Sequence, residues 1–158
     1  MQRSDLLQKL ISELDSANIH LKVSSESDAS KLVGDEIFHL PAISFCVLCL
    51  ASLRSFKLSV PETGHFVASV LQESVSGLKN AQTDLRWSFR LRAVCADALD
   101  FLDRTALITI DKDKIVKATE RGKAFLNESC STEPSLELYR RGIVRGLDRA
   151  LAKGDRLL

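Results

Sequence analysis

Apolar residues recur at steps of three and four along most of the chain, and this period predicts a protein built mainly from helices. The segments with this spacing lie at 4–15, 37–56, 59–76, 84–103 and 134–153. The stretch at 42–53 is apolar on almost every side. A helix of that kind is buried, so we expect it to be covered either by its own fold or by a partner protein.

A different pattern follows the third long helical segment. Two short β-prone runs at 106–110 and 115–118 flank a polar turn at 111–114, which predicts an antiparallel hairpin. Apolar and polar residues also alternate within the acidic segment 16–36, and three apolar residues there suggest an edge strand for the hairpin: Ile19, Leu21 and Val23. The expected fold is therefore mainly α with a small antiparallel β-hairpin.

Capping residues indicate where these helices begin and end. Ser59-Val60-Pro61-Glu62 has the form of a capping box, in which the serine and the glutamate each satisfy a backbone N–H. We expect Ser76-Gly77 to end that helix and Thr83 to cap the next one. Residues 127–133 are expected to form a linker before the last helix, which begins near Pro134.

Composition limits the classes of function. The chain has 158 residues, of which 45% are hydrophobic and 27% charged, and its formal net charge is +1. This length suits one domain with its own core, and any attraction for a polyanion must come from a local patch. Four cysteines in a chain of this length do not form a disulfide framework. No signal-peptide or membrane-spanning pattern is present, so we expect a cytoplasmic protein that does not enter a membrane.

The stretch from Ala118 to Leu126, ATERGKAFL, carries a family resemblance. It resembles the LTxxGxxxL ending of the wing in winged-helix proteins, including the multiple-antibiotic-resistance-type regulators, with Ala118 in place of the usual leucine. The resemblance implies that Thr119 caps the next helix and that Gly122 permits close backbone packing. It covers residues 37–127 and implies a winged helix-turn-helix with extra N- and C-terminal helices.

Three regions follow from this resemblance. Residues 1–36 form an N-terminal helix and an acidic loop or edge strand, residues 37–127 form the winged-helix core, and residues 128–158 form a C-terminal docking or dimerisation helix. In a winged helix the third helix can enter a DNA major groove, led by its N-terminal residues.

Candidate nucleic-acid-binding residues lie on the third helix and the wing. Three arginines occupy the first half of that helix: Arg86, Arg90 and Arg92. Three lysines lie on the hairpin: Lys112, Lys114 and Lys117. The helix dipole disfavours cations at a helix N-terminus, so the arginines could serve an outside anion. Alternatively, they pair with the acidic segment 24–36 or with a partner protein.

The last helix is a candidate partner-binding element. One stripe carries Leu136, Tyr139, Ile143 and Leu147, and another face carries Arg141, Arg145 and Arg149 at steps of four. Such a helix either lies on the surface of its own domain with solvated arginines, or docks to another subunit or a second copy of the chain.

Motifs for enzymatic chemistry are absent from the sequence. Cys46-Val47-Leu48-Cys49 lies inside an apolar run without further ligands, so it indicates core packing and no metal site. The chain contains no Walker loop, no G-x-G-x-x-G and no G-x-S-x-G. We therefore expect a protein without catalytic residues or cofactors.

Two functions remain. The first is a non-enzymatic accessory subunit that binds a larger protein, with double-stranded DNA as a second ligand. Its size and architecture are similar to the winged-helix accessory subunits of SMC-like ATPases and to the small middle components of bacterial ABC-three-component antiviral defence systems. The second is a homodimeric winged-helix transcriptional regulator. The near-neutral charge and the apolar segment 42–53 favour the accessory subunit.

Overall fold

The structure is a computed structural model, and it describes residues 40–74, 86 and 88–154. The helix expected at 4–15, the edge strand expected at 19–23 and the boundaries expected at Ser76-Gly77 and Thr83 lie outside the described residues.

The described residues form five α-helices and one small antiparallel sheet, as the sequence predicts. Their order is helix, strand, helix, helix, strand, strand, followed by two more helices, and this order is compatible with a winged helix. The elements are α3 (Leu40–Ser52), β1 (Leu58–Ser59), the 3-10 turn η2 (Val60–Glu62), α4 (Thr63–Ser74), α6 (Phe89–Arg104), β2 (Ile108–Ile110), β3 (Ile115–Ala118), α7 (Glu120–Thr132) and α8 (Pro134–Ala152).

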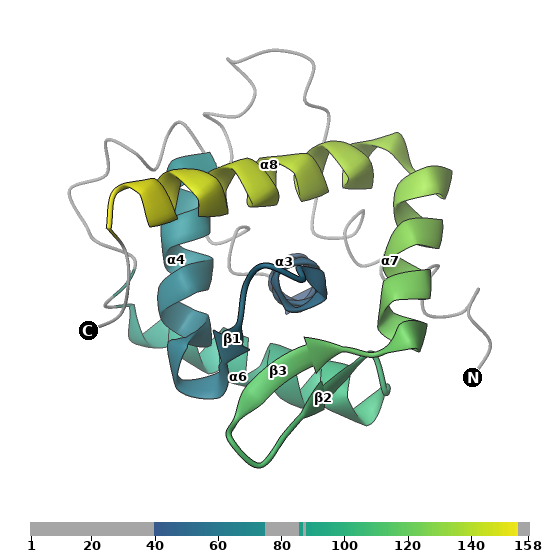
Figure 1. Ribbon diagram of the computed structural model, residues 1–158, viewed down its shortest axis with the longest axis horizontal. Helices are drawn as coiled ribbons and strands as arrows, with labels where there is room; N and C mark the ends of the chain where they lie inside the picture. Colours follow the sequence, from purple (N-terminus) through teal and green to yellow (C-terminus); the bar gives the residue numbers. More distant parts are fainter. Residues whose placement is uncertain (1–39, 75–85, 87, 155–158) are drawn as a thin grey trace.

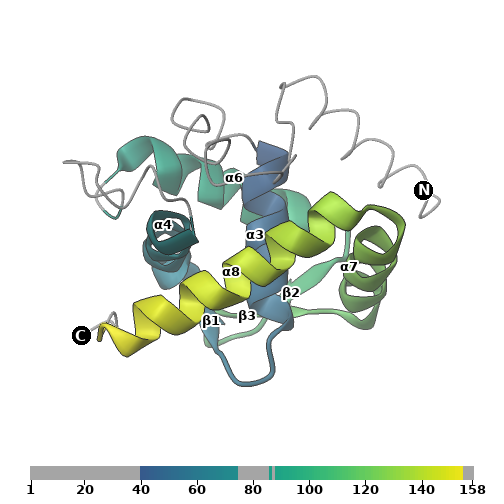
Figure 2. The same ribbon diagram turned by 90° about the horizontal axis from the view of Figure 1, so that it is seen from above.

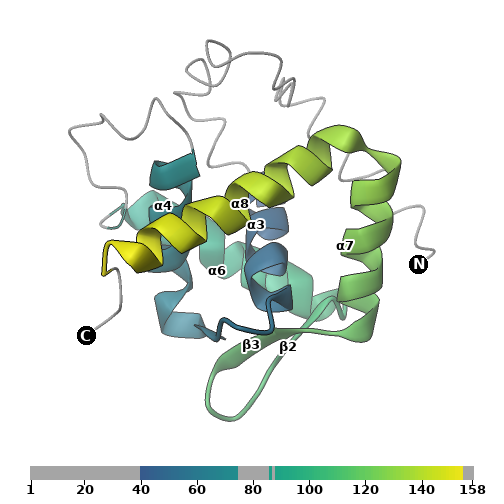
Figure 3. The same cartoon turned by 45° about the horizontal axis from the view of Figure 1, so that its top comes forward.

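Helix α3 forms the centre of the domain. Figure 1 shows it end-on, with α8 above it, α4 and α7 on its two sides, and α6 and the sheet below. Seen from above, α8 crosses over α3 (Figure 2), and Figure 3 shows the same crossing from an intermediate angle. Every residue from 41 to 50 is buried. The chain therefore covers its most apolar helix itself, and this helix needs no partner for burial.

The sheet has the strand order β1-β3-β2, with both pairs antiparallel. Its third strand is β1, whose Leu58 lies opposite Val116 of β3. The sequence pattern did not indicate this strand because it is only two residues long and has no alternation to read. Leu58 and Val116 are both buried, so the short strand still joins the sheet to the core.

The capping box expected at Ser59 is wrong. The Ser59 hydroxyl donates to the Glu62 carboxylate at 2.5 Å, and its side chain makes no capping bond to the backbone. Ser59 already belongs to β1, and Pro61 places a 3-10 turn between the strand and α4. The hydroxyl of Thr63 instead donates to the Ser59 carbonyl at 2.9 Å, which fixes the start of α4.

Helix α6 begins later than expected. Ser88 is its N-cap, because the Ser88 hydroxyl accepts a bond from the Leu91 N–H at 3.2 Å. Arg86 therefore precedes the helix, whereas Arg90 and Arg92 lie in its first turn. Leu91 is fully buried and anchors this end of α6 in the core.

The end of α6 directs the chain into the hairpin of β2 and β3. The Ala106 N–H donates to the Asp103 carbonyl and the Leu107 N–H to the Leu102 carbonyl, both at 3.0 Å. These two bonds form a Schellman motif, in which the residue directly after the helix C-cap has a left-handed backbone conformation. Ala106 takes that conformation, with φ of 57°. Leu107 and Leu102 are both buried, as the hydrophobic contact of this motif requires.

The junction of the β2–β3 hairpin with α7 confirms the packing expected for the ATERGKAFL stretch. The Thr119 hydroxyl accepts from the Gly122 N–H at 2.9 Å and donates to the Ala106 carbonyl at 2.7 Å. A Cβ at Gly122 would lie 2.0 Å from the Leu107 carbonyl oxygen, so only glycine fits. Phe125 is buried one turn further along α7.

The linker expected at 127–133 is wrong, because α7 continues to Thr132. Ser129 and Cys130 are buried, so the apolar face extends over the whole helix. Helix α8 then starts at Pro134 and packs most extensively against α4. Gly146 permits this approach, since a Cβ there would lie 2.8 Å from the Val70 carbonyl oxygen.

Replacing Ala106 with glycine should stabilise the domain. A left-handed conformation costs an alanine about 1–2 kcal/mol more than a glycine, and the greater freedom of glycine in the unfolded chain removes about half of that gain. Because Ala106 is exposed, no buried contact is lost. We expect a gain of about 0.5–1 kcal/mol in the free energy of unfolding, measured by urea titration. The control is Ala93→Gly on the exposed side of α6, which should lose about 1 kcal/mol.

Two glycine-to-alanine changes should act in opposite directions. Gly122→Ala forces a methyl group against the Leu107 backbone and should cost about 2–3 kcal/mol. A Cβ at Gly142, within α8, meets nothing within 4 Å, so Gly142→Ala should gain up to about 1 kcal/mol from helix propensity. Thermal unfolding measures both changes. Equal effects at the two positions would contradict the tight junction between the wing and α7.

Candidate functional site

The start of α6 carries the most exposed large apolar side chain among the described residues. Phe89 is 86% exposed, directly after the cap residue Ser88. Arg90 and Arg92 are exposed beside it, and Arg86 precedes the helix. We call these four residues the α6 entry surface: Arg86, Phe89, Arg90 and Arg92. Its position is fixed by the Ser88 cap and by buried Leu91.

The charge along α6 changes sign from its start to its end. The first turn contains no acidic residue, whereas Asp97, Asp100 and Asp103 are exposed in the second half. Arg104 then pairs with Asp100 at 3.0 Å. Cations at the start of a helix and anions further along oppose the helix dipole, so dipole stabilisation does not explain this arrangement. The three arginines of the α6 entry surface all have interaction partners within the chain.

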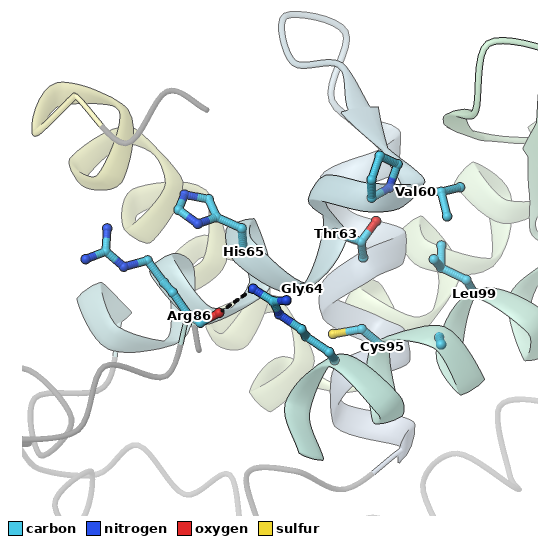
Figure 4. Close-up of a pocket in the computed structure, with 10 residues that line it drawn as sticks. Val60, Thr63, Gly64, His65, Arg86, Cys95 and Leu99 are labelled. Atoms are coloured by element: carbon cyan, nitrogen blue, oxygen red, sulfur yellow. Dashed lines mark hydrogen bonds between the residues drawn. The ribbon is translucent and has the colours of Figure 1, made fainter. Parts of the chain in front are cut away.

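A pocket of about 450 Å³ lies between the start of α4 and α6 (Figure 4). The described residues that line it include no acidic side chain; they are Val60, Pro61, Thr63, Gly64, His65, Arg86, Arg92, Cys95, Ala96 and Leu99. The volume is in the range of sites that hold a small ligand or one or two side chains. Arg86 and Arg92 belong to both the pocket and the α6 entry surface, so the two features form one continuous site.

The polar end of the pocket is built around Arg92. Its guanidinium Nη2 donates to the Arg86 carbonyl at 3.1 Å. Its aliphatic stem lies against Gly64, where an added Cβ would be 3.0 Å from the Arg92 Cγ. His65 follows Gly64, and its Nε2 atom is buried without a hydrogen-bond partner. In Figure 4, His65 and Arg86 lie at one end of the pocket, and Val60 and Leu99 lie at the other.

The lysines of the β2–β3 hairpin do not all remain unpaired, because Asp111 holds one of them. Asp111 organises the turn, since its carboxylate accepts from the N–H groups of Asp113 and Ile115 at 3.0 Å each. The Ile115 bond is the main cause that lowers the pKa of Asp111. The same carboxylate lies 3.4 Å from the Lys117 amine, so Lys117 is paired. Lys112 and Lys114 are exposed at the tip, and Lys114 has a left-handed backbone with φ of 63°.

The apolar stripe of α8 is not a partner surface. Leu136, Ile143 and Leu147 are buried in the domain's own core, because α8 packs against α3, α4 and α7. Tyr139 stacks on Phe45 with ring centroids 5.6 Å apart, and its hydroxyl donates to the Ala42 carbonyl at 3.3 Å. The expected role of these four α8 residues in partner binding is therefore corrected to core packing.

The arginines of α8 remain on its outer face. Arg141 pairs with Glu137 at 2.9 Å, which is the main cause that lowers the pKa of that carboxyl group. Arg149 donates to the Glu73 carbonyl at 3.3 Å, which ties α8 to α4. Arg145 is exposed between them. Their spacing follows the helix, but Arg141 is paired within α8 and Arg149 joins α8 to α4.

The four cysteines lie in the core as free thiols. Burial raises the pKa of Cys46 and of Cys49 well above the ordinary range, and it raises the pKa of Cys95 to about 12. Within residues 40–74, 86 and 88–154, no group of three His, Cys, Asp or Glu side chains is arranged to hold a metal ion. The α6 entry surface and the pocket present guanidinium, imidazole and aromatic groups.

Some parts of the site could not be predicted from the sequence pattern. The pocket depends on the approach of α4 to α6, and local periodicity carries no signal for that. Phe89 could have been recognised as an exposed residue from the sequence. It precedes the buried position Leu91 by two residues, so it lies outside the face of the helix that carries the buried positions. That inference needed the true start of α6.

Comparison with family models, curated proteins and solved structures finds no match for this chain. The helices of the described part are too short or too polar to cross a membrane.

The buried thiols should be almost inert in the folded protein. Their raised pKa values keep them protonated at pH 8, and only the thiolate reacts with a disulfide reagent. We expect reaction with Ellman's reagent to be more than about a hundredfold slower than for free cysteine. All four thiols should react once the protein is unfolded in guanidinium chloride. A thiol that reacts at the rate of free cysteine in the folded protein would contradict this burial.

Proposed function

We propose that this chain is a non-enzymatic winged-helix accessory subunit that binds a larger protein through the α6 entry surface. The order of helices and strands, and a sheet in which β3 lies between β1 and β2, support the winged-helix assignment. On that assignment α6 is the third helix, and the hairpin of β2 and β3 is the wing.

The observation that carries the proposal is the exposure of Phe89. Phe89 is 86% exposed and contributes little to the core. Aromatic residues and arginine are the types enriched at the energetic centres of protein interfaces, and Arg90 and Arg92 lie beside it. The surface is also held rigidly, because Leu91 and the Ser88 cap fix the first turn. Less conformational freedom is then lost on binding.

The charge pattern favours a protein over DNA as the main ligand. Asp97 and Asp100 follow Arg90 at steps of seven and ten residues, so they lie close to the same face of α6. A helix placed in a major groove by that face would bring both carboxylates towards the phosphate backbone. A protein partner can match both ends of the helix with opposite charges. The exposed Lys112 and Lys114 leave DNA as a second ligand at the wing.

The partner class is inferred from architecture. A small helical domain with a wing and a long terminal helix is similar to the accessory subunits of SMC-like ATPases and to the middle components of ABC-three-component defence systems. We propose a role in a DNA-processing or anti-phage defence complex of this kind. Two features expected from the sequence do not support this role. Helix α3 is covered by the chain itself, and the apolar stripe of α8 is buried in the core. The α6 entry surface takes their place in the argument.

Site-specific photo-crosslinking in the natural host tests this proposal. The crosslinking amino acid p-benzoylphenylalanine replaces Phe89 in one variant and Leu138 of α8, the matched position at 46% exposure, in another. We expect the variant at Phe89 to give one discrete adduct with a larger protein, and Arg90→Glu in the same chain to abolish it. The variant at Leu138 should give no adduct.

Two outcomes would overturn the proposal. An adduct from Leu138 alone would place the partner on α8. A chain that crosslinks only to itself and binds duplex DNA with a steep loss of affinity between about 50 and about 200 mM salt would be a homodimeric regulator. In that case Arg90→Ala should weaken DNA binding, and the α6 entry surface would be a recognition helix.

A further inference from the structure

Helix α6 presents one face to solvent along most of its length. Within the domain, α6 packs against α3, α4 and β2. Four residues on its other side are all exposed and follow one another at steps of four, three and four: Phe89, Ala93, Ala96 and Asp100. Residues at these steps lie along one line of a helix. We call these four residues the outer face of α6.

The shape of the outer face of α6 is complementary to itself. Its centre carries only the methyl groups of Ala93 and Ala96, which allow a second helix to approach closely. Phe89 projects from one end, with 86% of its surface exposed. If two copies pair in opposite directions about a point between the alanines, Phe89 of each copy lies opposite Asp100 of the other. A face that fits itself in this way can form a two-fold interface.

The region opposite the Phe89 ring contains a side chain that can bind it. Arg104 pairs with Asp100 at 3.0 Å, and 78% of the Arg104 side chain is exposed. The ion pair holds the guanidinium group of Arg104 beside Asp100 on the outside of the helix. A planar guanidinium group that pairs with a carboxylate through its edge still offers its face to an aromatic ring. In a two-fold pair, both copies make this contact.

The charges along α6 favour the antiparallel direction. Asp97, Asp100 and Asp103 are exposed in the second half of the helix, and the positive end of its dipole lies at the first turn. An antiparallel pair places the acidic half of each copy beside the first turn of the other. A parallel pair would place the two acidic halves side by side. The arginines near the first turn keep their partners within the chain, and this attraction does not require their donors.

We propose that the outer face of α6 binds a second copy of this chain, as an antiparallel α6 pair, when no partner protein is bound. A second copy fits because the same face supplies both the ring and the group that binds it. One helix pair buries less than the ~800 Å² per partner of a standard interface, so we expect a weak dimer with a Kd of roughly tens of micromolar. The inference goes beyond the proposed function and does not depend on it. A larger protein that binds Phe89 more tightly displaces the second copy.

Sedimentation velocity of the purified full chain, from about 1 to about 500 µM, tests the pairing. We expect a monomer at the lowest concentration and a dimer at the highest. Ala93→Gln places a longer side chain at the centre of the pair and should weaken dimerisation by about tenfold or more. The matched control is Ala152→Gln on the exposed side of α8, which should leave the Kd unchanged. Thermal unfolding confirms that both variants are folded.

A second pair of variants tests the contact between the ring and the guanidinium group. Arg104→Gln removes the group on which Phe89 of the other copy lies, and it should weaken dimerisation by about threefold or more. Arg145→Gln removes the same charge from the exposed face of α8 and should leave the Kd unchanged. Equal effects of the two changes would indicate that only the net charge matters, and would contradict this contact.

Photo-crosslinking of the purified chain determines the direction of the pair. With p-benzoylphenylalanine at position 89, an aromatic ring remains in place, and irradiation should give a covalent dimer. Mass spectrometry should locate the attachment within residues 96–104 of the second copy. Attachment within residues 88–92 would indicate a parallel pair, and attachment on α8 would place the interface elsewhere.

Three results would overturn the inference: a chain that stays monomeric at every concentration, equal weakening by Ala93→Gln and Ala152→Gln, or attachment of the crosslink outside residues 96–104. The inference and the proposed function can fail separately. If the purified chain is monomeric but position 89 crosslinks to a larger protein in the host, the inference fails while the proposed function stands. If the purified chain dimerises through α6 but position 89 reaches no larger protein in the host, the proposed function fails while the inference stands.

Discussion

The contact between the backbone of Gly122 and the carbonyl of Leu107 sets the position of the β2–β3 hairpin. Leu107 lies at the end of the Schellman motif that terminates α6, and Gly122 lies in the first turn of α7. The Thr119 N–H donates to that same Leu107 carbonyl at 3.0 Å. Three elements therefore meet at one peptide group, and a side chain at Gly122 would separate them. Because α6 is fixed at this end by the junction and at its other end by Ser88 and Leu91, the α6 entry surface is presented on a rigid helix.

Burial within the domain decides which apolar residues can be used for binding. Helix α3 is enclosed, and α8 directs its stripe inward onto α3, α4 and α7. The apolar faces of these two helices, whose sequences most resemble docking elements, are therefore buried in the core of the domain. Among the described residues that leaves few large apolar side chains in contact with solvent, and Phe89 is far more exposed than Leu40, Ile110 or Leu138. Because the core of the domain is complete without Phe89, we infer that this side chain has a role outside the core.

Much of the architecture follows from local patterns. Helical periodicity identified four of the five described helices: α3, α4, α6 and α8. The start of α7 and the junction at Thr119 and Gly122 were expected from the winged-helix resemblance, whose motif depends on residues close in sequence. Two errors at helix boundaries share a cause, because in both places polar side chains were taken to mark a helix boundary. Ser59 was assigned to a helix N-cap, and residues 127–133 were assigned to a linker. In the structure, burial of Ser129 and Cys130 carries α7 through that stretch. The pocket could not be predicted, because it arises where α4 and α6 approach, and no local pattern encodes that distance.

Three features that are individually unfavourable coincide at the start of α6. Phe89 faces solvent, arginines occupy the positive end of a helix dipole, and the nearby Nε2 of His65 is buried without a partner. Each could have been relieved by a single substitution: a polar residue for Phe89, an acidic residue in the first turn, or an apolar residue for His65. A bound partner protein that covers the start of α6 would remove the Phe89 ring from water. A DNA backbone would not cover the ring, and it would meet Asp97 and Asp100 on the same helix. The coincidence of these features at one site is therefore a stronger argument for a protein ligand than any of them alone.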